Sequence, residues 1–160
     1  MLTRLRSLEQ LMPFATAGEL LMRKRQSVVA VAPGATALAA LREMEEKDIA
    51  FLPVLEGGKL VGVVAERDIA RGVILRSRTL VREIMTTELY TVEPETRVPE
   101  CLTIMYGARV RHLPVMAAER IAGVLSVSDL TGSLIERHER LLRKLNEERV
   151  TLLFPYPSSY

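Results

Sequence analysis

Apolar and polar residues form two kinds of pattern along the chain, a helical spacing and a β-rich run, and each pattern occurs in two copies. Apolar residues spaced three and four apart predict a helix near residues 37–44 and another near 98–105. Each of these helices is followed by a β-rich run, a four-residue turn and a second β-rich run, which predicts an antiparallel hairpin. A short strand is expected before each helix, at 28–31 and 89–92, and a further helix after each hairpin. The predicted order in each half is therefore β-α-β-β-α.

The two halves are copies of one unit. A shift of 61 positions aligns residues 31–70 on residues 92–131 without a gap, and ten of the forty aligned pairs are identical. The phrase LVGVVAERD, which ends at Asp68, corresponds to IAGVLSVSD, which ends at Asp129. A unit of this length that occurs only twice predicts an α+β fold in which two like halves pack about a pseudo-twofold axis.

Further helices are expected at both ends of the repeat. Thr16 and Glu19 have the spacing of a capping box, so a short helix should begin there, and ELLM at 19–22 echoes REIM at 82–85. An apolar stripe marks a last helix that continues to about residue 149, as extra packing or a dimer contact. The expected divisions are an N-terminal helical segment at 1–18, a first repeat at 19–79, a second repeat at 80–137, and a C-terminal helix and tail at 138–160.

Composition and charge limit the classes of function. No apolar run approaches the roughly 18 residues that span a bilayer, and the start has no signal-peptide core, so a cytoplasmic protein without a membrane contact is expected. The single cysteine, Cys101, excludes an internal disulfide and a cysteine-based zinc site, and no metal is expected. The net charge is +2, and the short basic clusters at 23–25 and 76–78 lie among acids, which favours solvated loops over nucleic-acid binding.

No catalytic set is visible in the sequence. It contains no nucleophile elbow, no HExxH and no P-loop, and its two histidines, His112 and His138, have no matched acid or nucleophile motif. We therefore expect no enzyme activity and no catalytic cofactor.

Asp68 and Asp129 stand where a strand turns into a helix, and two roles are open to them. A carboxylate there can cap the helix by accepting backbone N–H groups. It can also hold the vicinal hydroxyls of a ribose with its two oxygens, next to a helix N-terminus that favours a phosphate. On residue type alone the cap is favoured, and the two roles are compatible.

Both copies resemble the CBS (cystathionine-β-synthase) domain family. The phrases that carry the resemblance are IMTTELYTVEPETRV, VRHLPVM and AGVLSVSDL, with DIAFLPVLEGGKLVGVVAERDIA in the first half. The resemblance implies two repeats packed as one unit, called a Bateman module, and a flat dimer of such modules. It also implies that adenine nucleotides or S-adenosylmethionine bind in clefts between the repeats and regulate a partner protein. With no second domain in sight, a stand-alone module is expected.

The resemblance further implies which residues form each cleft, because the Asp of one repeat works with the first strand and the pre-proline residues of the other. The Asp68 cleft would include Tyr90, Val110, Arg111 and His112; separately, Arg67 stands next to Asp68 in the sequence and could supply charge there. The Asp129 cleft would include Ser27, Val28, Val29, Ile49 and Ala50, with Ser126 and Ser128 as polar contacts to a phosphate. Ala65 stands where the first copy would need the hydroxyl of Ser126.

The two clefts are therefore expected to differ. The Asp68 cleft lacks the hydroxyl but gains Arg111 and His112, so additional phosphates should favour it. The Asp129 cleft has no nearby charge unless the basic segment 23–25 folds over it. Arg111 and His112 also fit an exposed strand start, and the apolar residues of both clefts also fit a plain core.

The expected function is that of a small-molecule-sensing regulatory module. AMP is the expected ligand, with ADP or ATP as alternatives and S-adenosylmethionine less favoured. The expected partners are a second copy in a homodimer and an unidentified regulated protein. The alternative is a ligand-free CBS scaffold that acts by dimerisation or by docking on another protein.

Overall fold

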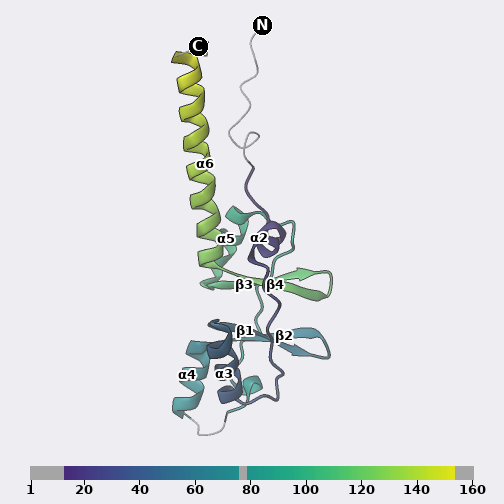
Figure 1. Cartoon of the computed structure of the whole chain (residues 1–160). Coiled ribbons are helices and arrows are strands. Elements are labelled where there is room, and N and C mark those ends of the chain that lie inside the picture. Colours follow the sequence, from purple (N-terminus) through teal and green to yellow (C-terminus); the bar gives the residue numbers. More distant parts are fainter. Residues whose placement is uncertain (1–12, 76–78, 154–160) are drawn as a thin grey trace.

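The computed structural model describes residues 13–75 and 79–153, and the side chains of 13–72 and 79–147. Two like halves lie one above the other, with their hairpins facing across the middle, and the long helix α6 rises from one half (Figure 1). The basic cluster expected at 76–78 lies outside the described residues.

The first half contains one hairpin and two helices: α3 (Ala37–Lys47), β1 (Phe51–Glu56), β2 (Lys59–Ala65) and α4 (Glu66–Leu75). The Thr36 hydroxyl caps α3 by accepting the Ala39 N–H at 3.1 Å, and Asp48 ends the helix in the left-handed conformation. The hairpin turns at Gly57 and Gly58, which both have positive φ, as a two-residue hairpin loop requires. The predicted antiparallel pairing is confirmed, with Leu52 opposite Val64.

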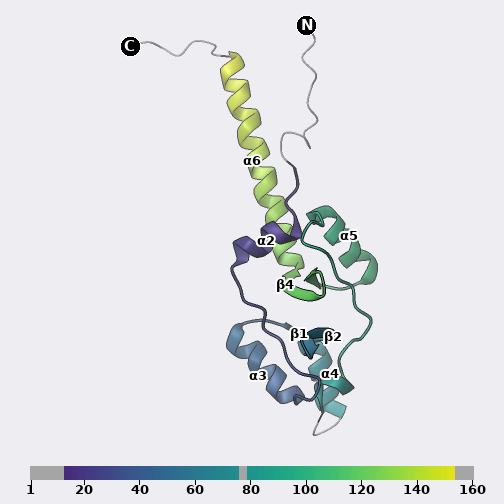
Figure 2. The ribbon, with the colours of Figure 1, turned by 90° about the vertical axis from the view of Figure 1, so that its right-hand side faces the viewer.

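The second half repeats this order as α5 (Val98–Ala108), β3 (His112–Ala117), β4 (Arg120–Ser126) and α6 (Val127–Leu153). Its hairpin is also antiparallel, with Leu113 opposite Leu125. Helix α6 continues past the end expected near residue 149 and leaves the body of the molecule (Figure 2). Among the described helices, none is long and apolar enough to cross a membrane.

The strand expected at the start of each half is reduced to a single pairing residue. Val31 pairs in parallel with Val54: its N–H donates to Pro53 O at 3.0 Å, and its carbonyl accepts the Leu55 N–H at 2.9 Å. Val92 pairs in the same way with Val115. The pairing stops because the prolines at 33 and 94 carry no N–H and open a turn. The residues just before Val31 and Val92 form no β-bridge and are available to line other surfaces.

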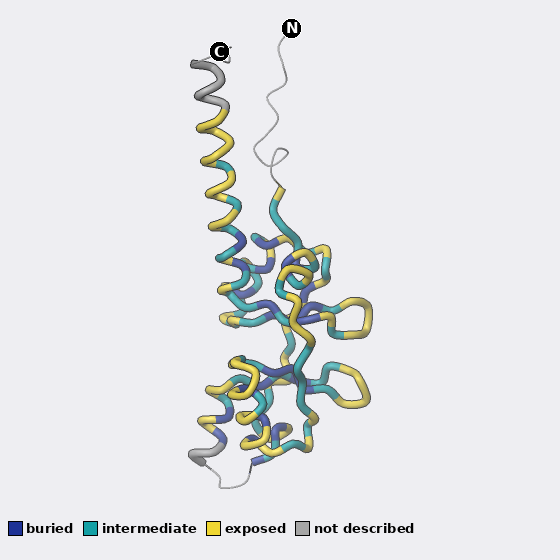
Figure 3. Tube along the Cα trace, viewed as in Figure 1, coloured by how far each residue is buried: buried dark blue, intermediate teal, exposed yellow. Residues whose placement is uncertain are grey.

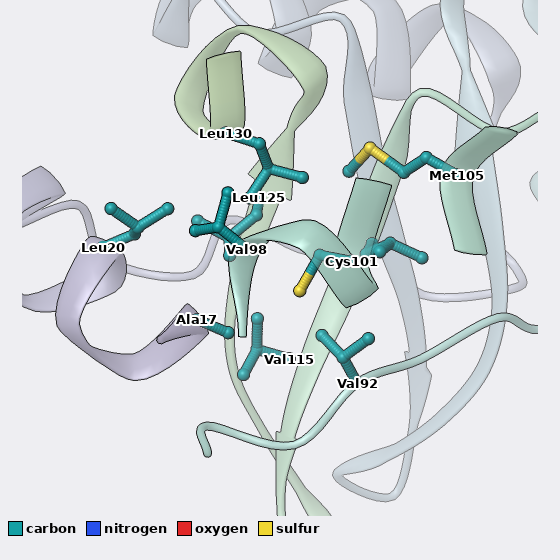
Figure 4. Packing of buried hydrophobic residues seen from close by; sticks show 10 residues of the cluster. Ala17, Leu20, Val92, Val98, Cys101, Met105, Val115, Leu125 and Leu130 are labelled. Atoms are coloured by element: carbon teal, nitrogen blue, oxygen red, sulfur yellow. The ribbon is translucent and has the colours of Figure 1, made fainter. Parts of the chain in front are cut away.

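The segment that precedes each repeat packs on the other repeat. Helix α2 (Ala17–Lys24) places Ala17 and Leu20 in the core of the second half, beside Val98 and Val115 (Figure 4). The short 3-10 helix η1 (Val81–Glu83) places Val81 in the core of the first half. The expected boundaries at 18/19 and 79/80 remain a prediction about sequence units, because the spatial cores are not contiguous in the chain.

Backbone hydrogen bonds hold the two exchanged segments, α2 and η1, in equivalent registers on the two halves. The Ala17 N–H donates to Thr96 O, and the Val81 N–H donates to Ala35 O, each at 2.8 Å. Thr96 and Ala35 are equivalent in the 61-residue repeat, so Ala17 and Val81 are equivalent at a shift of 64. The predicted capping box at Thr16 is confirmed. The predicted echo of ELLM and REIM, at a shift of 63, is wrong by one residue, because the first copy has three extra residues after this segment and not two.

The contact between α2 and β4 is tight enough to test by substitution. A β-carbon at Gly123 would lie 2.5 Å from Leu21 Cδ2, whereas one at Gly132, inside α6, would meet nothing within 4 Å. We expect Gly123→Ala to lower the free energy of unfolding by about 1–3 kcal/mol, because α2 must move away. Gly132→Ala should raise it by roughly 0.5–1 kcal/mol through helix propensity. Urea denaturation measures both, and equal stabilities would contradict the packing of α2 on the second half.

Candidate functional site in two clefts between the halves

Two clefts lie between the halves, one at each helix-bound aspartate. The cleft at Asp68 has a volume of about 650 Å³ and is lined by all five residues predicted to accompany it: Arg67, Tyr90, Val110, Arg111 and His112. Ala50, Ser126 and Ser128, which were predicted for the other cleft, line this one too. The cleft at Asp129 has a volume of about 530 Å³ and is lined by all seven residues predicted to accompany it: Ser27, Val28, Val29, Ile49, Ala50, Ser126 and Ser128. The structure thus brings each predicted set together, and ligand binding by these sets stays a prediction.

The crossing segments form one wall of each cleft. Residues 25–29 run from α2, which packs on the second half, to Val31 in the first half, and they line the Asp129 cleft. Residues 86–90, apart from Thr87, line the Asp68 cleft as the chain returns from the first half to the second. Each cleft therefore combines a helix start from one half with a crossing segment that leads to the other.

Phe51 and His112 separate the two clefts. Their rings are stacked, with centroids 4.6 Å apart and planes inclined by 16°, and both residues line both clefts. They are equivalent positions in the repeat, so the stack lies at the centre of the pseudo-symmetric arrangement. Burial lowers the pKa of His112, and the positive charges of Lys24 and Arg111 lower it further. The imidazole is therefore neutral at pH 7 and suited to stacking.

The two aspartates occupy the first turn of a helix rather than the capping position itself. Asp68 Oδ2 accepts the Ala65 N–H at 3.0 Å, and Asp129 Oδ2 accepts the Ser126 N–H at 2.7 Å. This is the carboxylate half of a capping box, in which the third helical residue reaches back to the cap residue. The prediction of a cap is thus corrected in detail: Ala65 and Ser126 are the cap residues, and each aspartate binds its cap's backbone.

Ser126 completes the capping box that Ala65 leaves open. Its hydroxyl accepts the Asp129 N–H at 3.3 Å, lies 2.7 Å from Asp129 Oδ2 and lies 2.8 Å from the Ser128 hydroxyl. The hydroxyls predicted to meet a phosphate are therefore engaged with each other and with Asp129. Since alanine has no hydroxyl, α4 keeps only the carboxylate half of the box.

Lys24 reaches into the Asp129 cleft from the last turn of α2. Its Nζ lies 3.0 Å from Asp129 Oδ2 and 3.3 Å from Val124 O. Burial alone would raise the pKa of the Asp129 carboxyl. The hydrogen bonds from Ser126 and Lys24, together with the lysine charge, outweigh burial and lower that pKa below its ordinary value. The basic segment 23–25 was expected to add charge to this cleft if it folded over it; Lys24 and Arg25 do line the cleft, whereas Arg23 pairs with Glu136.

The balance of charge in the clefts differs from the sequence expectation. The Asp68 cleft is lined by two arginines and three acids: Arg67, Arg111, Glu66, Asp68 and Glu88. The Asp129 cleft is lined by three cations and two acids: Lys24, Arg25, Lys47, Asp48 and Asp129. The sequence predicts that the Asp68 cleft attracts phosphates more strongly, because Arg111 lines it. That prediction did not include Lys47 in the Asp129 cleft or Glu88 in the Asp68 cleft, which only the fold brings there.

Two residues that line the Asp68 cleft, Arg111 and Tyr90, are exposed to solvent. Arg111 is exposed, and its carbonyl accepts the Val127 N–H at 3.0 Å, which ties the start of α6 to the residues before β3. The Tyr90 hydroxyl donates to Glu88 at 2.8 Å, and this hydrogen bond and the Glu88 charge raise the pKa of Tyr90. Both side chains can turn toward a ligand without breaking the core.

Sequence reasoning missed several lining residues, among them Phe51, Lys47, Thr86 and Glu88. Phe51 had a usable signal, because it aligns with His112 in the repeat. Lys47 had none, because it lies at the end of a helix whose distance from Asp129 is set by the packing of the two halves. No cluster of three potential metal ligands is found among the residues that the structure describes.

The arrangement of the chain is that of a CBS domain pair. The protein-family model of the CBS domain matches the chain twice, at residues 17–74 and 81–136. The chain therefore belongs to the CBS domain family. It is 33% identical over 120 residues to the mitochondrial CBS domain-containing protein CBSX3 of Arabidopsis thaliana, a match that covers 69% of this chain and 58% of that protein. The chain thus corresponds to little more than half the length of that relative.

Solved structures show the same fold. A putative signal-transduction protein with CBS domains from Burkholderia ambifaria is 35% identical, with a TM-score of 0.71, over 76% of this chain and 95% of that one. At lower identity, the fold is shared with two ligand-bound proteins. One is CBSX2 in complex with AMP, at 23% identity and TM-score 0.66 over 76% and 97% of the two chains. The other is the CBS pair of MJ0100 in complex with 5′-methylthioadenosine and S-adenosylmethionine, at 20% identity and TM-score 0.71 over 78% and 99%.

The Lys24–Asp129 ion pair predicts a pH-dependent contribution to stability. Because the pKa of Asp129 is lowered in the folded state, the pair stabilises the fold fully above the ordinary carboxyl pKa, and the effect is lost as pH falls through the lowered value. We expect Lys24→Met to raise the pKa of Asp129, as measured by NMR titration of its carboxyl carbon. The difference in unfolding free energy between the wild type and Lys24→Met should be present at pH 7 and vanish below the folded pKa. A constant difference across this range would contradict the pair.

Proposed function

We propose that the chain is a regulatory module that binds adenine nucleotides in its two clefts, with AMP as the first candidate and ADP or ATP next. The observation that carries the proposal is the pair of clefts of small-molecule size, each with a carboxylate held in the first turn of a helix. Such a carboxylate can hold ribose hydroxyls while the helix N-terminus faces a phosphate. CBS domain pairs are in general regulatory rather than catalytic.

The apolar lining of each cleft suits an adenine ring. Val28, Val29 and Ile49 line the Asp129 cleft, and Leu89 and Val110 line the Asp68 cleft. The stacked rings of Phe51 and His112 add an aromatic surface to both. A planar base gains most when it is covered on both faces by such side chains.

The cations of each cleft favour a phosphorylated ligand. Arg111 and Arg67 serve the Asp68 cleft, and Lys24, Arg25 and Lys47 serve the Asp129 cleft. S-adenosylmethionine is less favoured, because it carries no phosphate and brings a positive sulfonium. The bound compounds of two proteins with this fold, AMP in one and S-adenosylmethionine in the other, support an adenosine-containing ligand in general.

We also propose that the module is a homodimer that signals to a further protein. Helix α6 exposes Ile135, Leu142 and Leu145 at spacings of seven and three, so that they share one face. The helix beyond the body is largely exposed (Figure 3), while its base is fixed by Arg23 to Glu136 at 3.4 Å and by Arg137 over the Phe14 ring. An apolar stripe on a projecting helix is stabilised when a second helix covers it, and a second copy supplies one with a matching stripe.

Conservative substitutions of the two aspartates test nucleotide binding. Asp68→Asn and Asp129→Asn keep an oxygen that can accept the cap N–H but lose the charge that holds the ribose. By calorimetry, each should weaken AMP binding at its own cleft by roughly ten- to a hundredfold. Glu119→Gln, in the turn of the second hairpin and outside both clefts, is the matched control and should leave AMP affinity unchanged. If both aspartate variants bind AMP as the wild type does, the carboxylates serve only the capping boxes.

The same titrations separate a sensor from a ligand-free scaffold. A nucleotide that binds only the folded state raises the melting temperature with its concentration. Absence of heat and of a thermal shift with AMP, ADP, ATP and S-adenosylmethionine would favour a scaffold that acts by dimerisation or docking.

Light scattering tests the dimer. At micromolar concentration we expect a mass of about twice 17.9 kDa for the wild type. The double substitution Leu142→Glu with Leu145→Glu should give the monomer mass, because charges cannot be buried in the helix contact. Arg140→Glu, on the opposite face of α6, introduces the same charge and should leave the dimer intact. A monomeric wild type would refute the dimer, and a dimeric double variant would place the contact elsewhere.

A further inference from the structure

Only one of the two crossing segments places a cation on an aspartate. Lys24 Nζ lies 3.0 Å from Asp129 Oδ2. Residues 86–90, the crossing segment of the other half, contain no lysine or arginine. Glu88 lines the Asp68 cleft and accepts from the Tyr90 hydroxyl, so it gives Asp68 no counter-charge. The nearest described cation to Asp68 is Arg67, with its Nε at 3.8 Å from Oδ1 on a largely exposed side chain.

The ammonium of Lys24 occupies the side of Asp129 that a ribose would need. Oδ2 is within hydrogen-bond distance of the Ser126 N–H, the Ser126 hydroxyl and Lys24 Nζ. A carboxylate oxygen has about two lone pairs: the Ser126 N–H takes one, and Lys24 Nζ takes the other when the Ser126 hydroxyl donates its single proton to Ser128 Oγ, 2.8 Å away. A vicinal diol needs acceptor sites on both oxygens to be held by two hydrogen bonds. Lys24 must therefore move before Asp129 can take a ribose in this way.

The cost of displacing Lys24 depends on whether the ligand carries an anion that can pair with the displaced ammonium. A neutral nucleoside removes the counter-ion of Lys24 and supplies nothing in return, which leaves the charge of a three-quarters-buried side chain without its anion. A nucleotide supplies a phosphate to which the ammonium can move. Lys24 is flexible enough for this change, because four methylene groups separate its charge from the end of α2.

We propose that Lys24 is a built-in competitor for the ribose position of the Asp129 cleft, so that this cleft admits phosphorylated adenine ligands and rejects neutral nucleosides. This inference rests on the proposed nucleotide-binding function and adds a specificity-determining residue to it. The Asp68 cleft has no such competitor and discriminates less between the two kinds of ligand. A symmetric fold thereby offers two clefts with different ligand selection.

Calorimetry with AMP and adenosine tests the proposal on the full chain. Asp68→Asn serves as the background, so that the titration reports the Asp129 cleft. In that background AMP should bind measurably tighter than adenosine. Adding Lys24→Met, which keeps an unbranched side chain only one atom shorter and removes the charge, should tighten adenosine roughly tenfold and leave AMP equal or weaker. The AMP-to-adenosine preference should therefore fall by at least about tenfold.

Lys47→Met is the matched control. Lys47 lines the same cleft but does not contact Asp129, so its loss removes the same charge without removing a competitor. It should weaken AMP modestly and leave adenosine unchanged. Melting temperatures of all variants confirm that each is folded, and Lys24→Arg should retain the rejection of adenosine because it retains the competing cation.

Three negative outcomes are distinguishable. If AMP binds in the Asp68→Asn background and Lys24→Met does not tighten adenosine, Lys24 is not a competitor, and the inference fails while the proposed function stands. If none of AMP, ADP, ATP and adenosine binds the wild type, the proposed function fails, and the inference falls with it. If Lys47→Met tightens adenosine as much as Lys24→Met does, the effect is one of general charge, and the specific role of Lys24 is refuted.

Discussion

The exchange of leading segments is the constraint on which the rest of this structure depends. The backbone at Ala17 bonds to Thr96 in the second half, and the backbone at Val81 bonds to Ala35 in the first half. The chain must therefore pass between the halves twice, once after α2 and once after η1. These two passages are the walls of the two clefts, so the clefts are a consequence of the connectivity. Separation of the halves would break the backbone hydrogen bonds of the exchanged segments. It would also remove α2 from the core of the second half and η1 from the core of the first, so the integrity of the clefts is coupled to global stability.

The backbone is close to symmetric, whereas the side chains at the symmetric positions are not. The repeat places Phe51 opposite His112, Ala65 opposite Ser126, and, in the crossing segments, Ser27 opposite Glu88. Each pair alters one property of its cleft: the aromatic wall, the completeness of the capping box, and the charge near the aspartate. A duplicated fold can keep its packing residues nearly unchanged and differ in the few positions that line a cleft. The hairpin phrases FLPVL and HLPVM illustrate this, since their apolar residues are buried alike in both copies.

Most of the fold follows from the sequence, because the repeat, the helical spacing and the hairpin turns are local signals. The grouping of residues around Asp68 and Asp129 came from the family resemblance, and the structure brings the same groups together. The short first strands at Val31 and Val92 were overestimated, because β-branched residues indicate extended backbone but not whether a neighbour is present to pair. The sequence predicts a charge from Lys24 in the Asp129 cleft only if the segment 23–25 folds over it. No local signal shows on which half of the molecule the end of α2 lies. Lys47 and Glu88 carried no signal at all, because charged residues at helix ends and in loops are usually solvated.

The capping role of the two aspartates supports a ligand-binding role instead of competing with it. The N–H of the cap residue holds one carboxylate oxygen of Asp68 and of Asp129 in place before any ligand arrives, so little side-chain entropy remains to be lost on binding. At Asp129 this preorganised group is met by a lysine whose ion pair, about one quarter exposed, is worth on the order of 1 kcal/mol. That is small against the roughly 8 kcal/mol of a micromolar ligand. An internal counter-ion of this strength can be displaced by a ligand that brings its own anion, and it returns when that ligand leaves, which is the behaviour that a reversible sensor requires.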